Sequence, residues 1–156
     1  MNARILVVGV ALLSLAGCAK RFIPGTEIVD TDDTREILDV IQKFQASVEA
    51  KNADAIVQLA APDFNDDAGT PDLDDDLRYD NLGEALKERF SKIDHVRLDM
   101  DVRRIDIQDG GALAVYYYTL RYEMPSLSDK PQTAAELKRM ELKKIDKQGW
   151  RIVSGI

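Results

Sequence analysis

The hydrophobic pattern of this chain changes its period once, at His95, and that change limits the fold more than any other feature. Before His95, apolar residues recur at the three- and four-residue spacing of one helix face. After it, apolar and polar residues alternate, as in half-buried strands. The sequence therefore predicts an α+β domain in which helices come first and an antiparallel sheet follows.

Three helices are expected before His95. The first has Asp33 as its N-cap and Glu36 three residues later, as in a capping box. A short second helix is expected over about Ala53–Ala60, and a third opens at Asn81. The stripe that makes the first helix amphipathic is Ile37, Ile41, Phe44 and Val48.

Four strands are expected after His95. The first covers Val96–Ile107, and Arg103-Arg104 shifts its alternation by one residue, which indicates a β-bulge. Asp109-Gly110-Gly111 is a hairpin signal before the long strand Ala112–Met124. The last two strands are expected over Leu137–Ile145 and Trp150–Ile156.

The first residues resemble the export signal of a bacterial lipoprotein. Met1–Arg4 carries one positive charge, and Ile5–Leu15 is an apolar run of signal-peptide length, too short to span a bilayer as a helix. Leu15-Ala16-Gly17-Cys18 then matches the lipobox, a leucine and two small residues before the cysteine that receives lipid. We therefore expect cleavage before Cys18 and attachment to a membrane through lipid on that cysteine.

This reading divides the chain into a signal peptide over residues 1–17, a lipidated cysteine and tether over 18–32, and one domain over 33–156. Ala19 follows the cysteine, where the Gram-negative sorting pattern uses aspartate to retain lipoproteins at the inner membrane. The resemblance therefore implies the periplasmic face of the outer membrane.

Charge and cysteine content exclude two classes of protein. The net charge is −7, and loss of Arg4 with the leader leaves 20 basic and 28 acidic residues, or −8. An acidic chain without a basic stripe is not expected to bind nucleic acid. Cys18 is the only cysteine, so a disulfide-stapled fold is excluded as well.

The order of elements, with four short segments, resembles the NTF2-like superfamily, which includes SnoaL-like and ketosteroid-isomerase-like proteins. The segments are residues 40–44, 52–56, 62–69 and 147–153, and the similarity covers 33–156. It implies a cone in which three N-terminal helices pack on a curved, mostly antiparallel sheet, with a cavity at one end. It also implies that a homodimer through the outer face of the sheet can form.

The residues do not reproduce the isomerase site of that family. Asp66 or Asp67 falls near the position of the catalytic base, but Phe44 stands where an oxyanion-hole tyrosine is needed. The oxyanion hole of that site also needs a second, protonated acid, but Arg139 or Met140 stands near its position. Without these hydrogen-bond donors the main electrostatic contribution to catalysis is missing.

Dehydratase-like relatives pair histidine with aspartate, but His95 is the only histidine and is expected at a surface junction. Asp66 and Asp67 are kept as a candidate acid site.

An acidic cluster precedes the third helix. Leu77 and Gly83 occupy the positions where a calcium-binding EF-hand needs glycine and glutamate. We interpret the cluster as a solvated loop, with weak cation binding as the alternative, and expect no metal site and no cofactor. Its acids are Asp63, Asp66, Asp67, Asp72, Asp74, Asp75, Asp76 and Asp80.

The candidate ligand pocket is formed by Phe44, Tyr116, Tyr118 and Trp150. The even positions of Ala112–Met124 are apolar or aromatic throughout, so this face is expected to point inward. Tyrosines on it either fill the core or line a cavity for a small apolar ligand.

These features together predict an exported, membrane-anchored NTF2-like lipoprotein, a non-enzymatic module that binds a small ligand or a partner at the cell envelope. Two alternatives stay open. One is a partner-binding or structural lipoprotein with a filled cavity. The other is an enzyme that uses Asp66 or Asp67.

Overall fold

The computed structural model describes residues 20–67 and 76–156. The predicted signal peptide, Cys18 and three acids of the cluster, Asp72, Asp74 and Asp75, lie outside the described residues. Among the described helices, none has both the length and the hydropathy that crossing a membrane requires.

Three helices are present, as predicted: α1 (Asp32–Glu49), α2 (Ala53–Leu59) and α3 (Tyr79–Ser91). The predicted cap of α1 was wrong. Thr31 is the N-cap, and it exchanges hydrogen bonds with Thr34, whose backbone N–H donates to Thr31 Oγ1 at 3.1 Å while Thr31 N–H donates to Thr34 Oγ1 at 2.9 Å. Asp33 instead turns its carboxylate toward the sheet.

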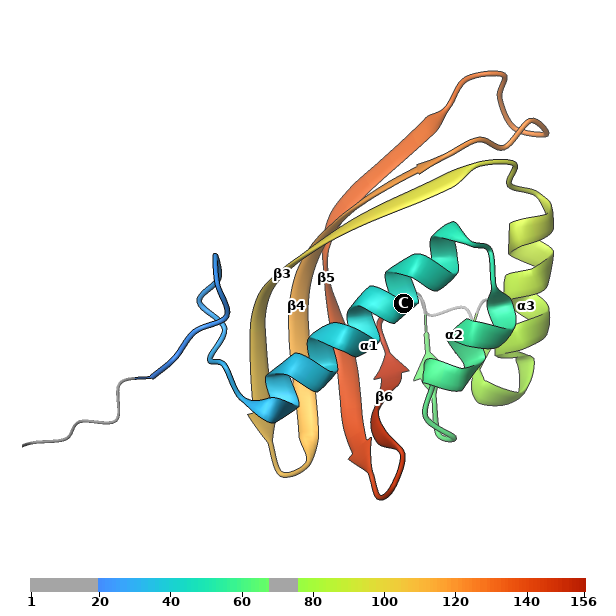
Figure 1. The fold of residues 1–156 in the computed structure, drawn as a ribbon. Coiled ribbons are helices and arrows are strands. Elements are labelled where there is room, and N and C mark those ends of the chain that lie inside the picture. Colours follow the sequence, from blue (N-terminus) through green and yellow to red (C-terminus); the bar gives the residue numbers. More distant parts are fainter. Residues whose placement is uncertain (1–19, 68–75) are drawn as a thin grey trace, which may run out of the picture.

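The main sheet has four antiparallel strands in the order β3 (Val96–Gln108), β4 (Gly111–Tyr122), β5 (Gln132–Ile145) and β6 (Gly149–Ser154). The register between β3 and β4 shifts between Val102 and Arg104, which confirms the predicted bulge. A bulge adds twist and bend to its strand. In Figure 1 the long strands curve over α1, while α2 and α3 lie beyond the C-terminal end of α1.

Two very short strands, β1 (Asn65–Asp66) and β2 (Leu77–Arg78), pair on their own. They flank the undescribed part of the acidic cluster and lead from α2 into α3. Ala60 forms a parallel bridge with Ile152, and Ala61 N–H donates to Ile152 O at 2.7 Å. These contacts fix the start of the loop to β6.

The core lies between α1 and the concave face of the sheet. The inward assignment of the even positions of β4 is confirmed for its first half, because Ala112, Ala114 and Tyr116 are buried. Every buried hydrophobic residue of the described chain lies between Ile28 and Ile152, so residues 20–156 contain the complete core described here. We therefore expect this part to fold without the leader.

Part of the segment predicted as a tether is folded. Phe22 and Val29 form an antiparallel bridge, and Ile28 between them is only 3% exposed. Arg35 of α1 donates two hydrogen bonds, of 2.6 and 2.8 Å, to the carboxylate of Asp30. The same contact lowers the pKa of Asp30. The domain therefore begins about ten residues before the first predicted helix.

Candidate functional site

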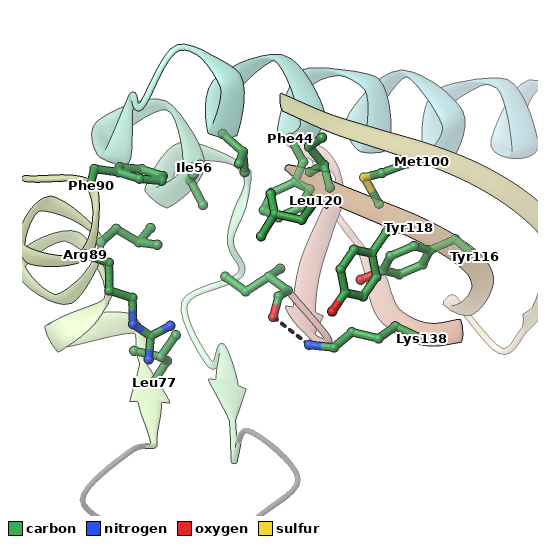
Figure 2. A pocket seen from close by; sticks show the side chains of 14 residues that line it. Phe44, Ile56, Leu77, Arg89, Phe90, Met100, Tyr116, Tyr118, Leu120 and Lys138 are labelled. Carbon is green, nitrogen blue, oxygen red and sulfur yellow. Dashed lines mark hydrogen bonds between the residues drawn. The ribbon is translucent and has the colours of Figure 1, made fainter. Parts of the chain in front are cut away.

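A cavity of about 230 Å³ lies between the concave face of the sheet and the three helices (Figure 2). Its walls are mostly aliphatic and aromatic, as in sites for small apolar ligands. The helices contribute Phe44, Val48, Ile56, Leu86, Arg89 and Phe90, and the remaining walls are Leu77, Leu98, Met100, Tyr116, Tyr118, Leu120, Lys138 and Ile156.

The cavity arises from the order of side chains along the inner face of β4. Small side chains, Ala112 and Ala114, come first and are buried in the core. Tyr116 and Tyr118 follow, opposite Val102 and Met100 of β3. These residues lie next to the β3 bulge, which bends that strand. The alternation turns the tyrosines inward, and their register with β3 places them at the wide end of the cone.

Three side chains make four hydrogen bonds to the residues that follow β6. Tyr116 Oη donates to Gly155 O at 2.8 Å. Asp66 Oδ2 accepts from Gly155 N–H at 2.8 Å and from Ile156 N–H at 2.9 Å. Lys138 Nζ donates to Ile156 O at 3.4 Å, as drawn in Figure 2. These contacts hold Gly155–Ile156, hereafter the 155–156 segment, so that the Ile156 side chain lines the cavity.

Gly155 is required for this arrangement. Its φ is +85°, in the left-handed region that side chains disfavour. A Cβ at this position would overlap the carbonyl oxygen of Arg139. The 155–156 segment can therefore reach Asp66 only because residue 155 is glycine.

The two tyrosines stay uncharged in this site. Burial, followed by the charges of Asp66 and other neighbours, raises the pKa of Tyr116 far above its ordinary value. Burial and Glu136 raise the pKa of Tyr118. Both phenols are therefore protonated near neutral pH, so they can donate hydrogen bonds but cannot serve as bases.

Three of the four predicted pocket residues line the cavity: Phe44, Tyr116 and Tyr118. Trp150 does not. It lies on the inner face of β6, 2% exposed, and its Nε1–H donates to Asp33 Oδ1 at 3.0 Å. The tryptophan therefore packs against the start of α1, away from the wide end of the cone.

The two predicted acids do not line the cavity. Asp66 is half-buried and faces the 155–156 segment, and Asp67 is exposed. The other groups considered from the sequence also lie elsewhere. His95 is on the surface, where its Nδ1 is 3.0 Å from Glu123 Oε2. Within the described residues, no cluster of histidine, cysteine and acidic side chains has the arrangement of a metal site.

The lining residues that the sequence did not single out include both cations, Arg89 and Lys138, as well as Ile156. Lys138 occupies one of the alternate positions of β5 that point inward, as its pairing with the inward-facing Tyr116 shows. The alternation along β5 could have predicted this inward direction, but a lysine is normally assigned to the solvent-exposed face of a strand.

No known protein-family profile matches the sequence, and no curated protein matches it either. Solved structures do. An NTF2-like superfamily protein from Salmonella enterica serovar Typhimurium superposes with a TM-score of 0.66 and 19% identity, over 78% of this chain and 86% of the other. A ketosteroid isomerase-like protein from Erwinia carotovora atroseptica gives a TM-score of 0.67 at 12% identity, over 81% and 95%.

A third structure comes from an NTF2-like protein of Streptomyces avermitilis that has been proposed to be a dehydratase. It superposes with a TM-score of 0.65 at 12% identity, over 79% of this chain and 93% of the other. At these identities the similarity concerns the backbone and carries no site residues. The superpositions nevertheless agree with three helices on a curved, mostly antiparallel sheet. The chain therefore has the NTF2-like fold.

Proposed function

We propose that this chain is a non-enzymatic protein of the cell envelope that binds a small apolar or amphipathic ligand and is held to a membrane by lipid on Cys18. The observation that carries the proposal is the apolar cavity of about 230 Å³ at the wide end of the cone. Such cavities favour ligands through burial of apolar surface, about 25 cal/mol per Å².

A binding role is favoured over an enzymatic one by what the polar groups already do. Asp66 and Tyr116 are both hydrogen-bonded to the 155–156 segment. Phe44 offers no hydroxyl. A catalytic site needs an acid or base within reach of the substrate, together with oriented donors. These side chains instead support the wall of the cavity.

One observation favours a second candidate function, binding of a protein partner through the convex face of the sheet. Tyr117 and Leu137 are paired across β4 and β5, and they are 40% and 59% exposed. Exposed apolar side chains that adjoin one another suit a protein contact, including one with a second copy of this chain. The cavity would then be part of the core.

The neutral fluorescent probe N-phenyl-1-naphthylamine should bind residues 20–156 and gain fluorescence. Leu120→Trp should weaken this binding by about tenfold or more, because the indole fills space that the probe needs. Leu127→Trp is the matched control, since Leu127 is 66% exposed and does not line the cavity. Equal binding by both variants, or no binding by the wild type, would contradict a ligand cavity and favour the partner function.

Membrane attachment has its own test. Cys18→Ala should abolish metabolic labelling with palmitate and leave the precursor uncleaved, because the lipoprotein peptidase acts on a lipid-modified cysteine. The full chain should then stay at its precursor mass by gel and mass spectrometry. Normal processing of the variant would show that the leader is an ordinary secretory signal.

A further inference from the structure

The only charged side chains among the described lining residues are two cations, Arg89 of α3 and Lys138 of β5. In a chain of net charge −7, an apolar cavity lined by cations alone is unexpected. The long stems of both side chains can pack along apolar walls while their charged ends stay near water.

Neither cation forms an ion pair with a carboxylate side chain in the described part of the chain. Other basic residues near them are paired: Lys87 with Asp54 at 2.7 Å and Lys92 with Glu88 at 2.7 Å. Arg89, on the same helix, forms no ion pair with a described residue, although its charge contributes to the lowered pKa of Glu88. Among the described residues, Lys138 donates to Ile156 O at 3.4 Å and lies 5.9 Å from the centre of the Tyr118 ring, and no carboxylate side chain pairs with it.

Two carboxylates lie close enough to raise the pKa of Tyr116. They are Asp66 and Glu136, and neither lines the cavity. Asp66 is held by the backbone N–H groups of the 155–156 segment. An anion inside the cavity would therefore meet positive charge first.

The two charged ends lie on one side of the cavity. In Figure 2 the guanidinium of Arg89 and the ammonium of Lys138 lie at the lower edge, while Phe44, Phe90, Leu120 and Met100 lie at the upper edge. A molecule that satisfies both sides has an apolar body and one charged end. Guanidinium groups match the two oxygens of a carboxylate in a bidentate contact, and ammonium groups add a second charged donor.

We propose that the ligand is an anionic amphiphile, with an apolar chain in the cavity and a carboxylate or phosphate between Arg89 and Lys138. This inference rests on the proposed ligand-binding function and narrows it to one charge class. A free fatty acid and a lipid with a phosphate head share this chemistry, and the experiment separates them.

The test measures displacement of N-phenyl-1-naphthylamine from residues 20–156 by four ten-carbon amphiphiles below their micellar concentrations. These are decanoate, decyl phosphate, decanol and decyltrimethylammonium. Decanoate or decyl phosphate should displace the probe at concentrations about tenfold lower than decanol does, and decyltrimethylammonium should be the weakest. The stronger of the two anions identifies the head group as carboxylate or phosphate.

Two double variants attribute the effect to the cations. Arg89→Gln/Lys138→Gln should bind decanoate about as weakly as decanol while retaining the probe. Lys87→Gln/Lys92→Gln changes the net charge equally on exposed, ion-paired residues outside the cavity, so its preference for the anion should be unchanged. Arg89→Glu/Lys138→Glu should reverse the preference toward decyltrimethylammonium. Circular dichroism confirms that each variant is folded.

The outcomes separate the two proposals. If the probe binds but decanoate, decyl phosphate and decanol compete equally, the anionic ligand is excluded and the apolar-ligand function stands. If both double glutamine variants lose the preference equally, overall charge is responsible and the assignment to Arg89 and Lys138 is wrong. If no form of the protein binds the probe, the proposed function itself is overturned.

Discussion

Replacing Trp150 with alanine is expected to lower the free energy of unfolding by about 3–5 kcal/mol, the largest effect of any single change proposed for this chain. The indole is 2% exposed and joins β6 to α1, so its removal leaves a cavity in the narrow end of the cone. Urea unfolding followed by circular dichroism measures the change. Fluorescence is unsuitable because Trp150 is the only tryptophan.

Trp150→Phe separates packing from hydrogen bonding. It keeps most of the apolar ring but loses the N–H that donates to Asp33, so we expect a smaller loss of about 1–2 kcal/mol. Leu127→Ala at an exposed position should change stability by less than about 0.5 kcal/mol. An alanine variant no less stable than the phenylalanine variant would mean that Trp150 does not belong to the core.

The pH dependence of the Trp150→Phe effect follows from Asp33. Hydrogen bonds from Lys144 and then from Trp150 lower the pKa of Asp33 in the folded state. Stability from a carboxyl with a lowered pKa is present above its unfolded value, about 3.9, and is lost as the pH falls through the folded value. The difference between wild type and Trp150→Phe should therefore narrow below about pH 4.

The fold was predictable from the sequence because its strongest signals are local. The apolar residues of α1, spaced by four, three and four positions, identify the buried face of the helix, and the alternation in β4 identifies the buried face of that strand. The shift of the alternation at Arg103 indicated the bulge. Two features were not local. β5 begins at Gln132, five residues before the predicted start, because residues 132–136 lack apolar alternation yet pair with β4. The bridge between Phe22 and Val29 likewise forms no periodic pattern.

The cavity was harder to predict because a strand pattern gives the face of a side chain but not its position along the cone. Tyr116 and Trp150 both point inward, yet the first lines the cavity and the second fills the narrow end. The distinction depends on the register between strands, which pairs Lys138 with Tyr116 and Trp150 with Lys144. Lys138 was missed for the same reason: its inward direction appears only once β5 is aligned with β4.

The last expected result concerns Asp66, the acid nearest to the position of a catalytic base. Asp66→Ala should lower the free energy of unfolding by about 2–3 kcal/mol, because hydrogen bonds to a charged acceptor contribute about 1.5–3 kcal/mol each and the released segment recovers part of this from water. Asp66→Asn should lose less, since its amide oxygen can still accept from Gly155 N–H. Asp106→Ala, which removes an exposed carboxylate of β3, is the control.

The same variant distinguishes a structural acid from a catalytic one. If Asp66 fixes the 155–156 segment, its loss releases Ile156 from the cavity wall, and affinity for N-phenyl-1-naphthylamine should change together with stability. Gly155→Ala should reproduce both changes, because a side chain there forces the segment away from Arg139 while Asp66 is retained. A stable Asp66→Ala protein with unchanged probe binding would leave Asp66 without a structural role and would revive the enzymatic alternative. Agreement between the two variants would instead assign the acid to the wall of the binding cavity.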